Sequence, residues 1–225
     1  MTTILTTHVG SLPRSKELSE LLFAKDKGEE YSKEKFDEVL SLNVDQIVKR
    51  QLEVGIDFIS DGEMSKISYA TYIKDRIDGF SGESERRAPA DLDDFPEYKE
   101  KIAKSGGTPT YSRPCCTHEL KIKDEISLLN DISNFNTSLK KFNHTKAFMN
   151  AASPGVINVF MPNKFYNSDD DYLNKLSSIM ALEYEKITAA NIQVQLDCPD
   201  LALARHMNFK DLTEDEFLKR AEIQI

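Results

Sequence analysis

The sequence predicts an α/β fold built from repeated helix–strand units with parallel strands. Apolar side chains from Phe36 to Leu52 follow the spacing of one helix face, and Gly55 stands where helices commonly end. A strand pattern at 56–59 comes directly after it. Residues 168–197 repeat this order, with a capped helix pattern, Asn191 at the helix end and then a strand. Two units of matching design predict parallel strands joined by helices.

Composition limits the class of protein. The chain has 225 residues, of which 40% are hydrophobic, and a net charge of −9. That charge argues against nucleic acid or an anionic membrane as the main partner. Three cysteines, two of them adjacent, make no disulfide framework and favour a reducing compartment. Without a long apolar run or a basic, apolar leader, we expect a cytoplasmic protein.

Five segments carry strand patterns, and helix patterns separate them. The predicted strands are 4–9, 56–59, 115–122, 147–151 and 192–197.

Residues 81–112 do not fit this rhythm. They are highly charged, hold three Pro and three Gly, and show no sustained hydrophobic period. A connection of this length is more often an active-site lid or a disordered insertion than a domain boundary. We therefore expect one domain over 1–225 with a long insertion at 81–112.

The last predicted strand has one polar face and ends in an acid. Gln193, Gln195 and Asp197 share this face, which is unexpected in a parallel sheet covered by apolar layers on both sides. One interpretation is a wet cavity in which Asp197 holds a substrate group such as an ammonium. The other is that Asp197 only caps the following turn. The pattern alone supports both equally.

Two further segments place polar groups at predicted strand ends. Asp61-Gly62-Glu63 is either a surface turn, for which these residues are favoured, or a site at the carboxyl end of a parallel strand. His8-Val9-Gly10-Ser11 combines an imidazole, a hydroxyl and a glycine that lets a ligand approach the backbone. A single His near a strand end is more often structural than catalytic.

A metal site is a weaker hypothesis. Cys116 and His118 are two apart on a predicted strand, so they would share a face, with Cys115 or Cys198 as a third ligand. The spacing matches no strong zinc motif, and buried cysteines are common. Arg113 is either a carboxylate or phosphate contact or a solvated loop charge.

Taken together, several segments resemble the catalytic domain of cobalamin-independent methionine synthases, a family that includes epoxyalkane–coenzyme M transferase-like proteins. The matching motifs are Thr6–Arg14, Gly55–Glu63, Asp78–Phe80, Ser153–Gly155 and Gln195–Ala202. They occur in the family's order over most of the chain. The residue after Asp197 departs from the family, since a Cys-Pro pair stands where the family has Glu-Pro.

The resemblance implies a (β/α)₈ TIM barrel that uses zinc to activate a thiol. The thiolate would attack a methyl group on a folate, so the implied activity is like that of 5-methyltetrahydropteroyltriglutamate–homocysteine methyltransferase. By position, Val9 and Ser11 would contact the amino-acid thiol, such as homocysteine. Glu63 and Asp197 would hold its ammonium group.

Three more residues are substrate-binding candidates by the same resemblance. His8 stands in the first motif, and Arg113 and Cys116 resemble a segment near the folate side.

The end of the chain limits what the resemblance implies. Only 26 residues follow Pro199, whereas three more strand–helix units need roughly 90 at about 30 each. We therefore expect a C-terminally truncated barrel with about the first five units and without the family's zinc ligands. No catalytic or metal-binding residue is assigned, and the chain alone is expected to be inactive.

Alternatives remain open. The chain could be a non-catalytic half-barrel that binds a ligand or another protein, with a second chain or a homodimer covering its open edges. It could be a related zinc–thiol alkyl transferase with another substrate, or an enzyme with a new metal site at Cys116 and His118.

Overall fold

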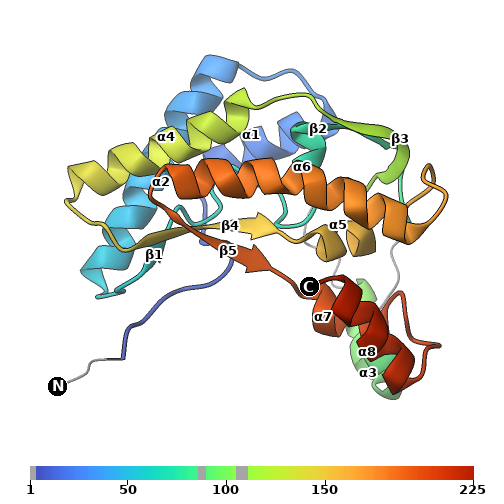
Figure 1. Cartoon of the computed structure of the whole chain (residues 1–225). Coiled ribbons are helices and arrows are strands. Elements are labelled where there is room, and N and C mark those ends of the chain that lie inside the picture. The colour runs from blue at the N-terminus through green and yellow to red at the C-terminus, as the bar shows by residue number, and fades with distance from the viewer. Residues whose placement is uncertain (1–3, 86–89, 105–110) are drawn as a thin grey trace.

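In the computed structural model, which describes residues 4–85, 90–104 and 111–225, helices cover one face of a small parallel sheet (Figure 1). The α-helices are α1 (Lys16–Lys27), α2 (Lys33–Glu53), α3 (Pro96–Lys104), α4 (Ile126–Lys141), α5 (Pro154–Phe160), α6 (Asp169–Ala189), α7 (Asp200–Leu203) and α8 (Glu214–Ile223). The strands are β1 (Ile59–Ser60), β2 (Ile77–Ser81), β3 (Cys115–Ile122), β4 (Ala147–Ala152) and β5 (Gln193–Asp197). Short 3₁₀ helices span Tyr72–Asp75, Ala90–Asp94 and Ala204–His206.

The parallel sheet has the order β1-β4-β5 and confirms the parallel helix–strand design. The predicted strand at 4–9 is reduced to a single parallel bridge between Thr7 and Phe58. The cause is local, because the Asp57 carboxylate accepts the Thr6 backbone N–H at 2.8 Å in place of a regular ladder bond. This bridge adds the N-terminal segment beside β1.

The predicted strand at 115–122 forms, but its expected place in the parallel series is wrong. It is β3, and it pairs antiparallel with β2 in a separate two-stranded sheet. Its exposed Glu119 and Lys121 suit a two-stranded ribbon, because a central parallel strand is covered on both faces. Along the parallel sheet, β5 is therefore the fourth segment, after the N-terminal bridge, β1 and β4, and not the fifth.

The two predicted helix–strand units form as expected. Ser32 caps α2 by accepting the Lys35 N–H at 3.2 Å, and Ser168 caps α6 by accepting the Asp171 N–H at 3.0 Å. Gly55 and Asn191 take left-handed conformations at φ 82° and 59°, which reverse the chain into β1 and β5. Sequence alone thus sets where these helices begin and end.

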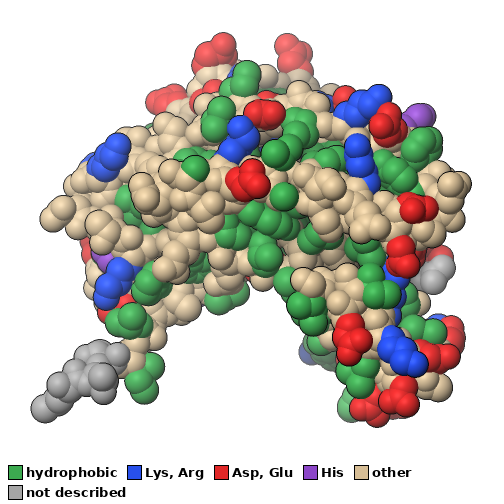
Figure 2. Space-filling view, viewed as in Figure 1, with side chains coloured by type: hydrophobic (Ala, Val, Ile, Leu, Met, Phe, Trp, Pro, Cys, Tyr) green, Lys and Arg blue, Asp and Glu red, His purple; other side chains and the backbone are tan. Residues whose placement is uncertain are grey.

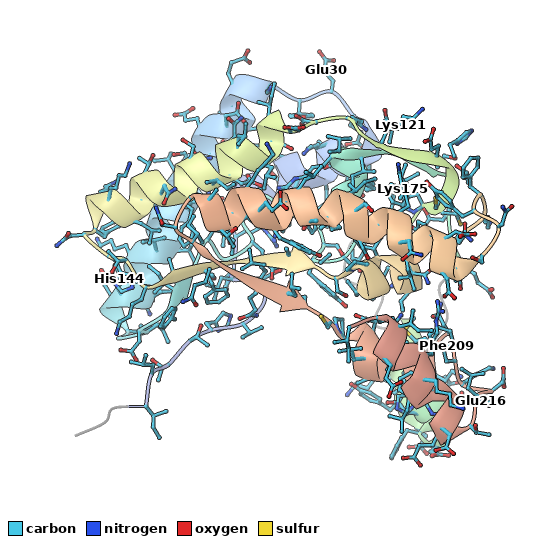
Figure 3. The ribbon with its side chains drawn as sticks, in the orientation of Figure 1. Glu30, Lys121, His144, Lys175, Phe209 and Glu216 are labelled. Carbon is cyan, nitrogen blue, oxygen red and sulfur yellow. The ribbon has the colours of Figure 1, made fainter. Side chains whose placement is uncertain are left out.

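Two apolar cores hold the helices on the sheet. One joins α1, α2 and α4 to β1 and β4 around Phe135 and Ile59. The other lies under the β2–β3 ribbon, around Tyr172 and Leu176 of α6. Charged side chains such as Lys121 and Lys175 point away from these cores (Figure 3). No helix in the described segments is long and apolar enough to cross a membrane.

The opposite face of the sheet is hollowed. Figure 2 shows a concavity beneath the sheet, between the N-terminal segment and the projecting α7 and α8. Two pockets open on this side, one beside Thr7 and Gln193 and one at the carboxyl ends of the strands. In the predicted insertion at 81–112, residues 86–89 and 105–110 lie outside the described residues, and the rest includes α3.

Candidate functional site

A pocket of about 350 Å³ lies where the parallel strands end. Val9 and Ser11 come from the N-terminal segment, Glu63 from the turn after β1, and Asp197 from the end of β5. The carboxyl ends of parallel strands meet at one edge of a sheet, which is why these distant residues converge. Four of the seven predicted substrate-binding residues therefore line one pocket.

Glu63 is the most constrained residue of this pocket. Its side chain is buried, and its backbone is left-handed at φ 56°, a conformation that non-glycine residues adopt at a cost. Its N–H donates to Asp61 Oδ1 at 3.1 Å, which fixes the turn. Ser11 Oγ donates to Glu63 Oε2 at 2.5 Å, whereas the buried Oε1 has no hydrogen-bond partner among the described residues. A strained backbone thus presents a carboxylate with unused acceptor capacity.

Arg14 fixes the backbone of the turn that carries Glu63. Its Nη2 donates to the backbone carbonyls of both Glu63 and Lys66, each at 2.7 Å. Because a guanidinium bridges two carbonyls of one turn, the position of Glu63 does not depend on a ligand.

Asp197 supplies the second carboxylate. It is half-buried at the end of β5 and accepts from Asn150 Nδ2 at 3.0 and 3.2 Å. Among the described residues, no Lys, Arg or His forms an ion pair with it. A half-buried carboxylate without a cation can accept a cationic donor from a ligand.

Tyr69 and Cys198 complete the wall of the pocket, and sequence reasoning did not assign them. Burial raises the pKa of both side chains, so both are neutral near pH 7. Tyr69 comes from an irregular stretch with no strand or helix pattern, and Cys198 was noted as a possible third metal ligand and as a departure from the family, not as a substrate contact. Nothing in the local sequence marks either as a pocket residue.

The other three predicted residues lie outside this pocket. His8 is exposed, and Cys116 is buried under the ribbon, where burial raises its thiol pKa to about 11. The Arg113 guanidinium lies 4.2 Å from the centre of the Phe160 ring. Phe160 in turn contacts Tyr69, with ring centres 5.7 Å apart, so Phe160 connects Arg113 to the wall of the pocket.

The described residues do not fit a zinc site. No three of their His, Cys, Asp or Glu side chains come together as a metal-ligating group. Cys116 is buried with its thiol on the His118 carbonyl at 3.5 Å, whereas the His118 ring is exposed and contacts Thr117 at 3.0 Å. Cys116 and His118 were expected to share one face of the strand, but their side chains do not come together at one metal site.

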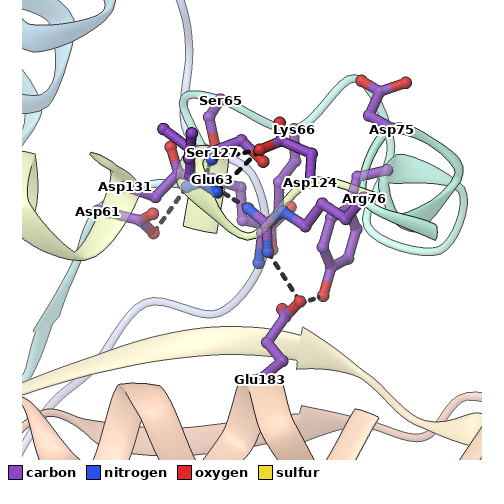
Figure 4. Close-up of polar contacts among 12 residues, drawn as sticks. Asp61, Glu63, Ser65, Lys66, Asp75, Arg76, Asp124, Ser127, Asp131 and Glu183 are labelled. Carbon is purple, nitrogen blue, oxygen red and sulfur yellow. Dashed lines mark hydrogen bonds and ion pairs between the residues drawn. The ribbon is translucent and has the colours of Figure 1, made fainter. Parts of the chain in front are cut away.

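A buried network of charges lies behind the turn that carries Glu63 (Figure 4). Arg76 donates to Glu183 at 2.8 Å and to Asp131 at 2.5 Å, and the Tyr72 hydroxyl donates to Glu183 at 2.5 Å. Ser65 also donates to Asp131, at 2.7 Å. Sequence reasoning missed this network, because its members come from separate elements without a shared motif.

Electrostatics in the network differ from one acid to the next. Burial would raise the pKa of Glu183, but the charges of Arg76 and Lys66, together with the hydrogen bonds from Tyr72 and Arg76, outweigh burial and hold that pKa below its usual value. Burial raises the pKa of Asp131 and Asp61 despite the nearby cations. The Arg76 pKa rises because its two carboxylates outweigh its burial. The network therefore keeps Arg76 charged.

Two of the sequence motifs contact each other beside the pocket. Ser153 Oγ accepts the Val156 N–H at 3.0 Å at the start of α5 and donates to Asp200 at 2.8 Å. A Cβ on Gly155 would lie 2.1 Å from Asp200 Oδ2, so a larger residue there would force the Asp200 carboxylate to move. This contact ties the start of α5 to the segment that follows Asp197.

The fold and the site define an α/β protein that gathers carboxylates at the ends of parallel strands. Residues 4–88 match the family model described as the catalytic domain of cobalamin-independent synthase. Over these residues the chain is similar to the cobalamin-independent synthases, the family that its motifs resemble.

Individual proteins show the same similarity. The methionine synthase of Sulfolobus acidocaldarius is 25% identical over 200 residues, which are 88% of this chain and 52% of that protein. The 5-methyltetrahydropteroyltriglutamate–homocysteine methyltransferase of Bifidobacterium longum (strain NCC 2705) is 33% identical over 75 residues, 33% of this chain and 10% of that enzyme. The chain thus spans about half of the first relative and a tenth of the second.

A solved structure has the same fold. The B12-independent methionine synthase from Shewanella sp. W3-18-1, solved with selenomethionine, superposes with a TM-score of 0.65 at 18% identity. The match covers 96% of this chain and 57% of that one.

Proposed function

We propose that this chain carries the amino-acid-binding part of a cobalamin-independent, methionine synthase-type methyltransferase. The observation that carries the proposal is the pocket shared by Ser11, Glu63 and Asp197. In it, one carboxylate from the turn after β1 and one from the end of β5 have acceptor capacity that no described side chain uses. The names of the sequence relatives support homocysteine, or a similar amino-acid thiol, as the ligand.

In this proposal the two carboxylates bind the ligand's ammonium group. A cation that meets Glu63 and Asp197 forms charge-assisted hydrogen bonds in a partly buried setting, where they are stronger than in water. Ser11 keeps Glu63 Oε2 in place, so Oε1 is the oxygen available to the ligand. Val9, which is exposed, would contact the ligand's apolar carbons.

We further propose that the sheet of the N-terminal bridge, β1, β4 and β5 is part of a (β/α)₈ barrel, within a single domain over 1–225. The parallel order and the likeness to a synthase structure support this. A folate as methyl donor and a cytoplasmic location are also proposals, the latter supported by free cysteines at 115, 116 and 198. Because the described residues do not fit zinc, no step is assigned to a metal.

Calorimetric titration with L-homocysteine tests the proposal. Asp197→Ala removes one charged acceptor, so we expect binding to weaken about 10- to 100-fold, the effect of losing a hydrogen bond to a charged group. Asp78→Ala is the matched control, because Asp78 is an exposed acid on the β2–β3 ribbon. Equal affinity in both variants and in the wild type would contradict the proposal.

One observation favours a second candidate function, a half-barrel module that binds another chain. β5 is an edge strand of the described sheet, and Leu196 on it is 45% exposed. Measuring mass in solution and zinc content separates the candidates. A dimer or complex without homocysteine binding favours the half-barrel binding module. Tightly bound zinc that is lost in Cys116→Ala would instead favour an enzyme with a metal site at Cys116 and His118.

A further inference from the structure

We propose that Asn150 is a positioning residue, which orients the Asp197 carboxylate toward the ammonium group of a bound amino acid. This inference rests on the proposed function, because it assigns a role within the same pocket. Asn150 lies in the middle of β4, the central strand of the parallel sheet, and is buried. It matches no motif singled out in the sequence.

The contact between the two side chains is directional. Asn150 Nδ2 lies 3.0 Å from Asp197 Oδ1 and 3.2 Å from Oδ2, so one amide group spans both carboxylate oxygens. An ionised carboxylate only accepts, and the amide nitrogen only donates. The negative charge of Asp197 therefore selects the amide orientation, since the reverse would set two acceptors against each other.

This orientation has a cost. Asn150 Oδ1 is buried and has no hydrogen-bond partner among the described residues. A buried acceptor without a partner destabilises the fold, whereas an apolar side chain of similar shape would not. Stability alone thus does not explain an asparagine here, but the placement of a carboxylate for a ligand does.

The same residue links the two carboxylates of the pocket. Lys66 Nζ donates to the Asn150 backbone carbonyl, and Lys66 belongs to the turn that Arg14 clamps together with Glu63. The Lys66 ammonium is buried and lies 4.4 Å from the centre of the Tyr72 ring, which restricts its movement. A chain of contacts from the Glu63 turn through Lys66 and Asn150 to Asp197 sets the spacing of the two acceptors.

Two ligands separate positioning from general damage. L-Homocysteine and 4-sulfanylbutanoate differ only in the amino group, so the ratio of their dissociation constants measures recognition of the ammonium. Asn150→Leu replaces the amide by an apolar group of similar volume, and Asn150→Ser keeps a polar group too short to reach Asp197. Gln193→Leu is the matched control, because Gln193 lies on the same face but lines the other pocket.

We expect wild type and Gln193→Leu to prefer homocysteine, and both Asn150 variants to lose about tenfold of that preference, the effect of one charge-assisted hydrogen bond. Thermal unfolding of Asn150→Leu should show no loss of stability. An unchanged preference in the folded variants, or an equal loss of affinity for both ligands, overturns the positioning role alone. A wild-type chain without any preference overturns the proposed function and this inference with it.

Discussion

The pocket at the strand ends and the buried network behind it use the same kinds of side chain in opposite ways. In the network, Arg76 meets two carboxylates, and Glu183 and Asp131 each accept from a second donor. In the pocket, Glu63 Oε1 has no partner among the described residues, and Asp197 has an amide but no cation.

This difference distinguishes carboxylates that stabilise the fold from carboxylates that can bind a ligand. In a buried ion pair the charged groups already have partners within the protein, and breaking the pair leaves an uncompensated charge. A carboxylate with spare lone pairs at a pocket wall is costly to the fold but useful to a ligand. The turn from Asp61 to Lys66 joins the two regions, because Glu63 lines the pocket and the opposite side of the turn faces the buried network.

The largest expected effect is on the network. Arg76→Met leaves Asp131 and Glu183 buried without their cation, so we expect a loss of about 3–5 kcal/mol in the free energy of unfolding. Urea unfolding measures it, with Arg50→Met, whose side chain is 71% exposed, as the control. A loss below about 1 kcal/mol would show that the network is not closed in the way described.

A smaller effect is expected in the pocket. Ser11→Ala removes the hydroxyl that holds Glu63 Oε2, so homocysteine binding should weaken about fivefold, the effect of roughly 1 kcal/mol. Ser178→Ala, on the exposed face of α6, is the control. If calorimetry finds equal affinities in both variants, Ser11 does not position Glu63.

The smallest effect concerns pH at the shared turn. Burial raises the pKa of Asp61, so the folded state takes up its proton more readily than the unfolded state does. Lowering the pH through the window above the ordinary value of 3.8 therefore stabilises wild type relative to Asp61→Asn. We expect a gain below about 1 kcal/mol between pH 7.5 and 5.5 in urea unfolding. A change of the opposite sign would mean that nearby cations outweigh burial.

Local patterns predicted the parts of the fold that local physics determines. Ser32, Gly55, Ser168 and Asn191 mark helix ends because caps and left-handed residues act within a few positions. The family resemblance implied that Ser11, Glu63 and Asp197 share a site, and parallel strands bring them together by placing their carboxyl ends at one edge.

The sequence alone did not show which residues, far apart along the chain, contact each other in the fold. The strand pattern at 115–122 is the same for a parallel strand and an antiparallel ribbon, so β3 was assigned to the wrong sheet. Asn150 contacts Asp197, 47 positions away in the sequence, and Lys66 contacts Asn150, 84 positions away. The local sequence around these residues therefore does not reveal their roles. No pattern in the sequence marks Arg76, because its two carboxylates come from helices far along the chain.

The most direct test of the account is a crystal structure of this chain with L-homocysteine. We expect the ligand nitrogen within about 3 Å of both Glu63 Oε1 and an Asp197 oxygen, at ordinary hydrogen-bond distances. A bound ligand whose nitrogen lies away from both carboxylates would contradict it.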